Sequence, residues 1–127
     1  DLLRLLAEDP AAGGLEGAPA LAWDGGSWTF GELSARGLSA AAWLSGQGLR
    51  RGDLLLLALP DSAEWIAVFL GASRIGAQVA LASPGVPGPR LEEAARRLGP
   101  RAILSELAWP HLRARRLDPQ AARAVVA

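Results

Sequence analysis

Three side chains in this sequence could take part in acid–base chemistry: Asp61, Glu64 and His111, the only histidine. General acid–base catalysis needs such groups near one another and near the reacting atom. The two carboxylates stand where a helix should begin, and there they serve as capping groups and as partners of the helix dipole. His111 follows a proline and has no serine–acid pair near it in sequence, so we expect a surface position. These residues therefore predict helix capping and a solvated imidazole rather than a catalytic site.

Phosphate binding is the second chemistry to consider, because residues 83–89 are rich in glycine and proline (SPGVPGP). A phosphate loop holds its ligand with backbone N–H groups from closely spaced glycines at a helix start. This segment lacks the Gly-x-Gly-x-x-Gly spacing, and its prolines carry no amide hydrogen. We therefore expect a rigid connecting loop.

The charges are unevenly distributed along a chain whose formal net charge is zero. Residues 1–89 carry 5 Arg against 9 acidic residues, a net charge of −4, whereas residues 90–127 carry 8 Arg against 4, a net charge of +4. The zero total gives no overall attraction to nucleic acid or to an anionic membrane. A solvated basic face explains the C-terminal excess best, and a patch for a phosphate-bearing or acidic protein partner is the alternative.

Composition excludes several other kinds of site. There are no cysteines, so disulfides and thiol chemistry are absent, and one histidine cannot form a histidine metal site. All 13 basic residues are arginine, which leaves no lysine to act as a nucleophile or phosphate ligand. No apolar run approaches the roughly 20 residues that span a bilayer, and the first ten residues lack the pattern of a signal peptide. We expect a cytoplasmic protein without a membrane span and, since methionine is absent, one that is processed or excised from a longer chain.

The apolar pattern predicts one α/β domain that follows a short N-terminal helix and linker at residues 1–19. Thr29 and Glu32 have the spacing of a capping box, so a helix should follow them. The six apolar residues 54–59 show no alternation, which is typical of a parallel strand covered on both faces. The remaining expected elements are a hairpin over 20–30, helices over 62–75, 90–98 and 106–116, and strands over 77–82 and 101–105, with 120–127 left as a helical turn or a strand.

These elements predict a three-layer α/β fold for residues 20–127, with a mainly parallel sheet, flanking helices and an N-terminal β-hairpin. Half of the residues are hydrophobic, which is enough for a core in a chain of this length. The side chains expected in the core are Trp23, Trp28, Trp43 and Trp65, with Leu91, Ala94, Ala95 and Leu98 on the inner face of the helix over 90–98.

A series of short motifs runs through residues 15–106. The motifs are Pro19-Ala-Leu-Ala-Trp23, Trp28-Thr-Phe-Gly-Glu-Leu33, Gly48-Leu-Arg-Arg-Gly-Asp53, Leu59-Pro-Asp-Ser-Ala-Glu-Trp65, Phe69-Leu-Gly-Ala72 and Gly76-Ala-Gln-Val-Ala-Leu81. In this order and at this spacing they resemble the beginning of the adenylate-forming enzymes. This superfamily comprises acyl- and aryl-CoA synthetases, amino-acid adenylation domains and luciferases, and the resemblance is closest to the CoA ligases.

The resemblance implies a parent enzyme that uses ATP and Mg to convert a carboxylate to acyl-AMP and then forms a thioester with CoA or a carrier thiol. It also implies that Pro84 and Gly85, in the loop after the strand over 77–82, lie near CoA. Arg113, Arg115 and Arg116 could contact CoA phosphates, but a solvated helix face explains these arginines better.

The chain lacks several motifs of that superfamily. The superfamily has a Ser/Thr/Gly-rich phosphate loop that ends in lysine, and this loop is missing here. The ribose-binding aspartate and the catalytic lysine of the superfamily are missing as well. We therefore expect an N-terminal subdomain that has no catalytic or metal-binding residue, binds no cofactor by itself and is not catalytic alone.

Three functions remain open at this point. The leading one is the N-terminal part of an acyl- or aryl-CoA ligase, whose partners are the rest of that enzyme or neighbouring synthase domains. The second is a truncated or degenerate adenylation-like domain that serves as a non-catalytic adaptor in a polyketide or peptide synthase. The third, a small nucleotide binder, needs a phosphate loop that the sequence lacks. An excised subdomain would also expose surfaces able to form a homodimer.

Overall fold

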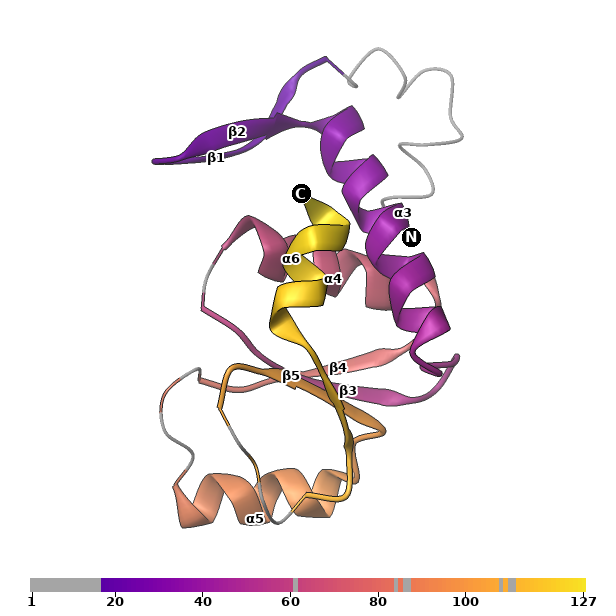
Figure 1. The fold of residues 1–127 in the computed structure, drawn as a ribbon, viewed down its shortest axis with the longest axis vertical. Coiled ribbons are helices and arrows are strands. Elements are labelled where there is room, and N and C mark those ends of the chain that lie inside the picture. Colours follow the sequence, from indigo (N-terminus) through magenta and orange to yellow (C-terminus); the bar gives the residue numbers. More distant parts are fainter. Residues whose placement is uncertain (1–16, 61, 84, 86–87, 108, 110–111) are drawn as a thin grey trace.

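The computed structural model describes residues 17–60, 62–83, 85, 88–107, 109 and 112–127. Figure 1 shows them as a sheet covered by helices, with a β-hairpin that extends beyond it. The helix expected over residues 1–9 lies outside the described residues.

The described chain begins with the hairpin, formed by β1 (Pro19–Trp23) and β2 (Gly26–Thr29), which pair antiparallel. The hairpin leads directly into α3 (Phe30–Gly46). The hydroxyl oxygen of Thr29 accepts a hydrogen bond from the backbone N–H of Glu32 at 3.1 Å, and the Glu32 carboxylate accepts one from the N–H of Thr29 at 3.1 Å. The capping box predicted from the sequence is therefore present.

A four-stranded parallel sheet, in the order β4-β3-β5-β6, forms the centre of the molecule. Its strands are β3 (Leu54–Ala58), β4 (Gln78–Leu81), β5 (Ala102–Ser105) and β6 (Arg115–Leu117). The apolar run predicted as a buried strand is β3, and it occupies an inner position between β4 and β5.

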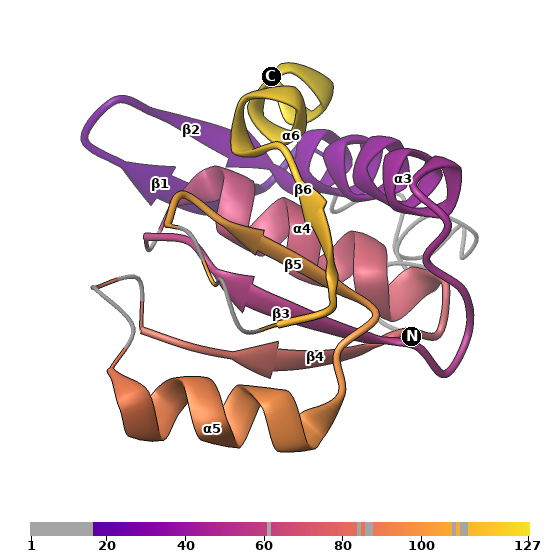
Figure 2. The same ribbon diagram turned by 60° about the horizontal axis from the view of Figure 1, so that its bottom comes forward.

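Helices cover both faces of this sheet (Figures 1 and 2). On one face lie α3, α4 (Ala63–Arg74) and α6 (Pro119–Val126), and on the other lies α5 (Pro89–Leu98). None of the helices in the described ranges is long and apolar enough to cross a membrane.

The side chains of β3 alternate between the two faces, as the pleat of a strand requires. Leu55 and Leu57 belong to the core cluster that also contains buried residues of α3, α4 and α6. Leu56 and Ala58 belong to a second cluster, which includes Ala95 of α5. Because these four side chains of β3 are each at most 3% exposed, the strand is covered on both faces and the predicted three-layer α/β fold is confirmed.

The helix predicted over residues 106–116 is wrong. Residues 115–117 form β6, which pairs in parallel with β5. Pairing with a distant strand supplies hydrogen bonds that local sequence cannot reveal, and it overrides the local pattern here. The ambiguity over residues 120–127 resolves as a helix, α6, which Asp118 caps by accepting from the N–H of Gln120 at 2.9 Å.

Two of the four core positions predicted on α5 are exposed. Leu91 and Ala95 pack against the cluster beneath this helix. Ala94 is exposed, and Leu98 is 56% exposed. The helix contacts the sheet along a single stripe, and Leu98, its last residue, lies beyond that contact.

The tryptophans divide between core and surface. Trp28, Trp43 and Trp65 are half-buried and pack against core clusters, in agreement with the prediction. Trp23 is 40% exposed, contrary to the prediction, because it lies at the end of the hairpin strand. Its ring packs edge-to-face with that of Trp28, with ring centroids 5.2 Å apart. Trp109, which the sequence pattern did not single out, is 2% exposed.

Candidate functional site

The loop after β4 contains the residues expected near CoA. Gly85 is exposed, and a Cβ atom at this position would meet no atom within 4 Å. Pro84 lies outside the described residues. The described part of the chain therefore leaves space beside Gly85 for a neighbouring group.

The connections that follow β3 and β4 leave the sheet toward opposite faces. β3 leads to α4 on one face, whereas β4 leads through the loop with Gly85 to α5 on the other (Figure 2). In α/β proteins, ligands bind outside the carboxyl ends of parallel strands, where neighbouring connections diverge in this way. The loop with Gly85 thus stands at the edge of the sheet where this class of fold binds ligands.

The acid–base candidates do not form a site among the described residues. Glu64 lies in the first turn of α4, where a carboxylate interacts favourably with the helix dipole. Ser62 caps this helix, because its hydroxyl oxygen accepts from the N–H of Trp65 at 3.2 Å. Asp61 and His111 lie outside the described residues. Within the described ranges, no group of three or more His, Cys, Asp or Glu side chains could hold a metal ion.

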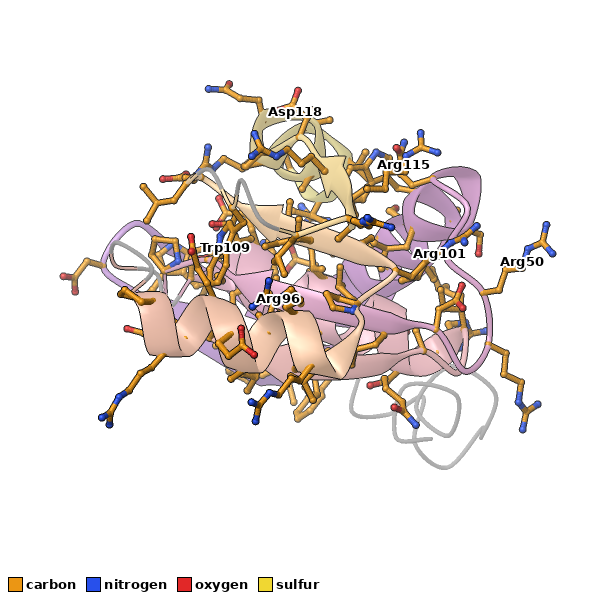
Figure 3. The ribbon with its side chains drawn as sticks, turned by 90° about the horizontal axis from the view of Figure 1, so that it is seen from below. Arg50, Arg96, Arg101, Trp109, Arg115 and Asp118 are labelled. Carbon is orange, nitrogen blue, oxygen red and sulfur yellow. The ribbon has the colours of Figure 1, made fainter. Side chains whose placement is uncertain are left out.

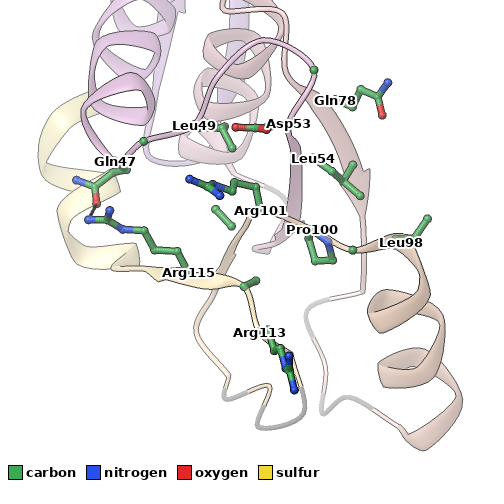
Figure 4. Close-up of a pocket in the computed structure, with 15 residues that line it drawn as sticks. Gln47, Leu49, Asp53, Leu54, Gln78, Leu98, Pro100, Arg101, Arg113 and Arg115 are labelled. Atoms are coloured by element: carbon green, nitrogen blue, oxygen red, sulfur yellow. Dashed lines mark hydrogen bonds between the residues drawn. The ribbon is translucent and has the colours of Figure 1, made fainter.

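A cleft of about 820 Å³ opens at the opposite edge of the sheet, where the four strands begin (Figure 4). The first residue of each strand lines it: Leu54, Gln78, Ala102 and Arg115. Turns with positive φ at Gly48 (92°), Gly52 (84°) and Gly99 (64°) form much of the remaining wall. Glycine adopts this backbone conformation at little cost, so the turns can bring the strand ends together.

Three exposed arginines line this cleft: Arg101, Arg113 and Arg115. Arg115 donates from Nη2 to Oε1 of Gln47 at 3.2 Å. Arg116, which was considered with Arg113 and Arg115 for CoA phosphates, does not line the cleft. The sequence did not single out Arg101, although its position as the first residue of the strand predicted over 101–105 was an available signal.

Trp109 lies away from this cleft, as the view from below in Figure 3 shows. Arg50, Arg101 and Arg115 gather toward one end of the molecule, and Trp109 lies toward the other. The indole N–H of Trp109 is buried and has no hydrogen-bond partner among the described residues. An unpaired buried donor is costly, and among the described residues the packing of this side chain in the cluster with Leu56 and Ile103 offsets that cost.

The described chain is a doubly wound α/β fold, in which a parallel sheet lies between two layers of helices. The sequence model of the family described as AMP-binding enzyme matches residues 9–127. The chain belongs to this family, as the motifs between residues 15 and 106 predicted.

Relatives and solved structures agree with this assignment. The 4-coumarate–CoA ligase 3 of Arabidopsis thaliana is 33% identical over 81 residues, which are 64% of this chain and 14% of that protein. The mitochondrial acyl-coenzyme A synthetase ACSM2A of Homo sapiens is 42% identical over 82 residues, which cover 60% of this chain and 14% of that protein. The crystal structure of VinN superposes with a TM-score of 0.82 at 25% identity, over 98% of this chain and 34% of that one.

The chain therefore spans 14% of the length of these two curated relatives. It corresponds to an N-terminal part of the adenylate-forming enzymes, as the sequence predicted.

Proposed function

We propose that this chain forms the N-terminal part of an acyl- or aryl-CoA ligase. The family match over residues 9–127 carries this proposal, and the names of the two curated relatives support a thioester-forming parent. The parent would use ATP and Mg to convert a carboxylate to acyl-AMP, and would then pass the acyl group to CoA or a carrier thiol.

The proposed role of this part is to build the framework that carries the reaction. The inner strand β3 is buried on both faces, so its position is fixed by the core rather than by a ligand. Several polar side chains cap helices by accepting hydrogen bonds from backbone N–H groups of the first turn, among them those of Thr29, Ser62 and Asp118. The absence of lysine from the sequence removes the residue type that this superfamily uses for phosphate binding and catalysis. The chain alone is therefore expected to be catalytically inactive.

A chimeric enzyme tests this role. The N-terminal segment of the Arabidopsis 4-coumarate–CoA ligase 3 that matches this chain is removed. The chain is then joined in frame to the remaining downstream part of that ligase. Exchange of labelled pyrophosphate into ATP is measured with 4-coumarate for the chimera, the isolated chain and the isolated downstream part.

We expect exchange by the chimera and none by either part alone. Robust exchange by the isolated chain would contradict the proposal. A chimera that folds, as judged by circular dichroism and gel filtration, but shows no exchange would support the non-catalytic adaptor instead.

The loop with Gly85 is proposed to border CoA in the complete enzyme. Its support is the location at the carboxyl ends of the parallel strands, beside the divergence of the connections after β3 and β4. Pro84 is included in this proposal from the sequence resemblance alone.

The proposed partners are the remaining domains of the ligase or neighbouring domains of a synthase. In the described part of the chain, β4 pairs only with β3, and Leu81 on β4 is 56% exposed. This edge is the surface through which the isolated chain would form a homodimer. Light scattering at two protein concentrations tests whether the isolated chain forms this homodimer. A molecular mass that stays that of a monomer at both concentrations would exclude the dimer. A cytoplasmic location stays a prediction from the sequence.

A further inference from the structure

We propose that the cleft at the amino ends of the strands binds a small phosphate-bearing anion between Arg101 and Arg115. This site is distinct from the loop with Gly85, which follows the carboxyl end of β4. The volume of about 820 Å³ falls within the range of about 300–1,000 Å³ that is typical of small-molecule sites.

Positive charge dominates the lining of the cleft. Its charged residues are Arg101, Arg113, Arg115 and Asp53, so the guanidinium groups exceed the carboxylates by two. The Asp53 carboxylate already accepts a hydrogen bond from the backbone N–H of Arg50 at 2.9 Å. Among the described residues, the ion pairs involve Arg96, Arg97 and Arg123, and none involves the arginines that line the cleft. The cleft therefore presents guanidinium groups that form no ion pair with a carboxylate of the described residues.

Arg101 and Arg115 are neighbours because the backbone holds them at the start of adjacent strands. The N–H of Arg115 donates to the carbonyl oxygen of Arg101 at 3.0 Å, and the N–H of Arg101 donates to the carbonyl oxygen of Leu54 at 2.8 Å. Figure 4 shows both side chains extending toward the side of the cleft where Gln47 lies. Gln47 accepts one hydrogen bond from Arg115, and a guanidinium group has five N–H donors. As far as the described residues go, most donors of this pair thus remain available to a ligand.

A phosphate group matches this pair in charge and in geometry. Guanidinium groups bind phosphate oxygens through two parallel hydrogen bonds, and the several oxygens of a phosphate allow two arginines to share it. The side chain of Arg113 points away from the pair in Figure 4. We therefore expect Arg113 to add only longer-range attraction, which salt would screen.

Calorimetry on the 127-residue chain tests the site with three probes: sodium pyrophosphate, ADP and adenosine. We expect saturable binding of pyrophosphate and of ADP with one site per chain, weakened by added NaCl, and no binding of adenosine. Tighter binding of ADP than of pyrophosphate would identify a nucleotide as the ligand. Equal binding would identify the phosphate groups alone.

Single substitutions separate the site from general surface charge. We expect Arg101→Ala and Arg115→Ala each to weaken pyrophosphate binding about tenfold, because each removes a charged hydrogen-bond donor. Arg116→Ala is the matched control, since it removes the same charge from the neighbouring position of β6 outside the cleft. Its dissociation constant should stay within about twofold of the original value, and circular dichroism confirms that each variant folds.

Three results would overturn the proposal. The first is an absence of saturable heat with pyrophosphate, and the second is an equal loss of binding in Arg116→Ala and Arg115→Ala. The third is binding of hexaglutamate by a chain that does not bind pyrophosphate, which would assign the cleft to an acidic protein segment.

Discussion

Gly71 of α4 lies so close to Ala41 of α3 that a Cβ atom on Gly71 would be 2.7 Å from the backbone nitrogen of Ala41. Such a Cβ would also be 2.8 Å from the Cβ of Ala40, so neither neighbour can yield without moving the backbone of α3. We expect Gly71→Ala to lower the free energy of unfolding by about 1–2 kcal/mol, because overpacking outweighs the better helix propensity of alanine. Urea denaturation measures this change.

Gly46 provides the matched control for that substitution. It is the last residue of α3, and a Cβ there would meet no atom within 4 Å. Gly46→Ala should therefore leave the stability unchanged or raise it by about 0.5–1 kcal/mol. Equal losses in Gly46→Ala and Gly71→Ala would show that the close approach of the two helices is not the cause.

The capping box of α3 gives a second prediction. Thr29→Ala removes the acceptor for the N–H of Glu32, and it should cost about 1 kcal/mol of unfolding free energy. Thr29→Ser keeps the hydroxyl. We expect its free energy of unfolding to stay within a few tenths of a kcal/mol of the original value, because serine and threonine differ by about this amount as N-cap residues. Thermal denaturation of the two variants measures this difference. Equal melting temperatures for Thr29→Ala and Thr29→Ser would contradict the prediction.

Trp109 gives a third prediction through its indole N–H, which has no hydrogen-bond partner in the part of the chain that the structure describes. Trp109→Phe removes this donor together with part of the ring, so the gain from losing an unsatisfied group offsets the lost packing, and we expect a change within about 1 kcal/mol. Trp109→Ala leaves a cavity in the cluster beneath α5 and should cost about 3–5 kcal/mol. A phenylalanine variant as unstable as the alanine variant would indicate that the N–H has a hydrogen-bond partner in solution.

The loop after β4 gives a fourth prediction, which requires the chimeric enzyme described above. Gly85→Leu fills the open space beside this residue. We expect a several-fold higher KM for CoA, because a side chain would obstruct the ligand, while the rate of pyrophosphate exchange stays the same. A substitution that slows exchange and leaves the KM for CoA unchanged would place the loop near the adenylation step.

Much of the fold follows from local patterns in the sequence. Thr29 and Glu32 predict the start of α3 because a capping box involves only residues of the same turn. The apolar run that forms β3 predicts a strand covered on both faces, since no polar side chain in it could meet water.

The features that sequence reasoning missed depend on distant partners. β6 contains two arginines and is only three residues long, so nothing local identifies it as a strand until β5 lies beside it. The same pairing brings Arg115 next to Arg101, and therefore the arginine pair of the cleft could not be predicted from either segment alone. The exposed Leu98 is a similar case, because its position depends on where α5 ends relative to the sheet.

The inner strand β3 pairs with β4 and with β5, and both of these partners follow it in the sequence. A ribosome synthesises the chain from its N-terminus, so β3 emerges before either neighbouring strand exists. Its edge that faces β5 stays unpaired until Ser105, the last residue of β5, has also left the exit tunnel. During that interval the nascent polypeptide displays an open strand edge with which other unfinished chains can pair, and a slower rate of translation after β3 would lengthen this exposure.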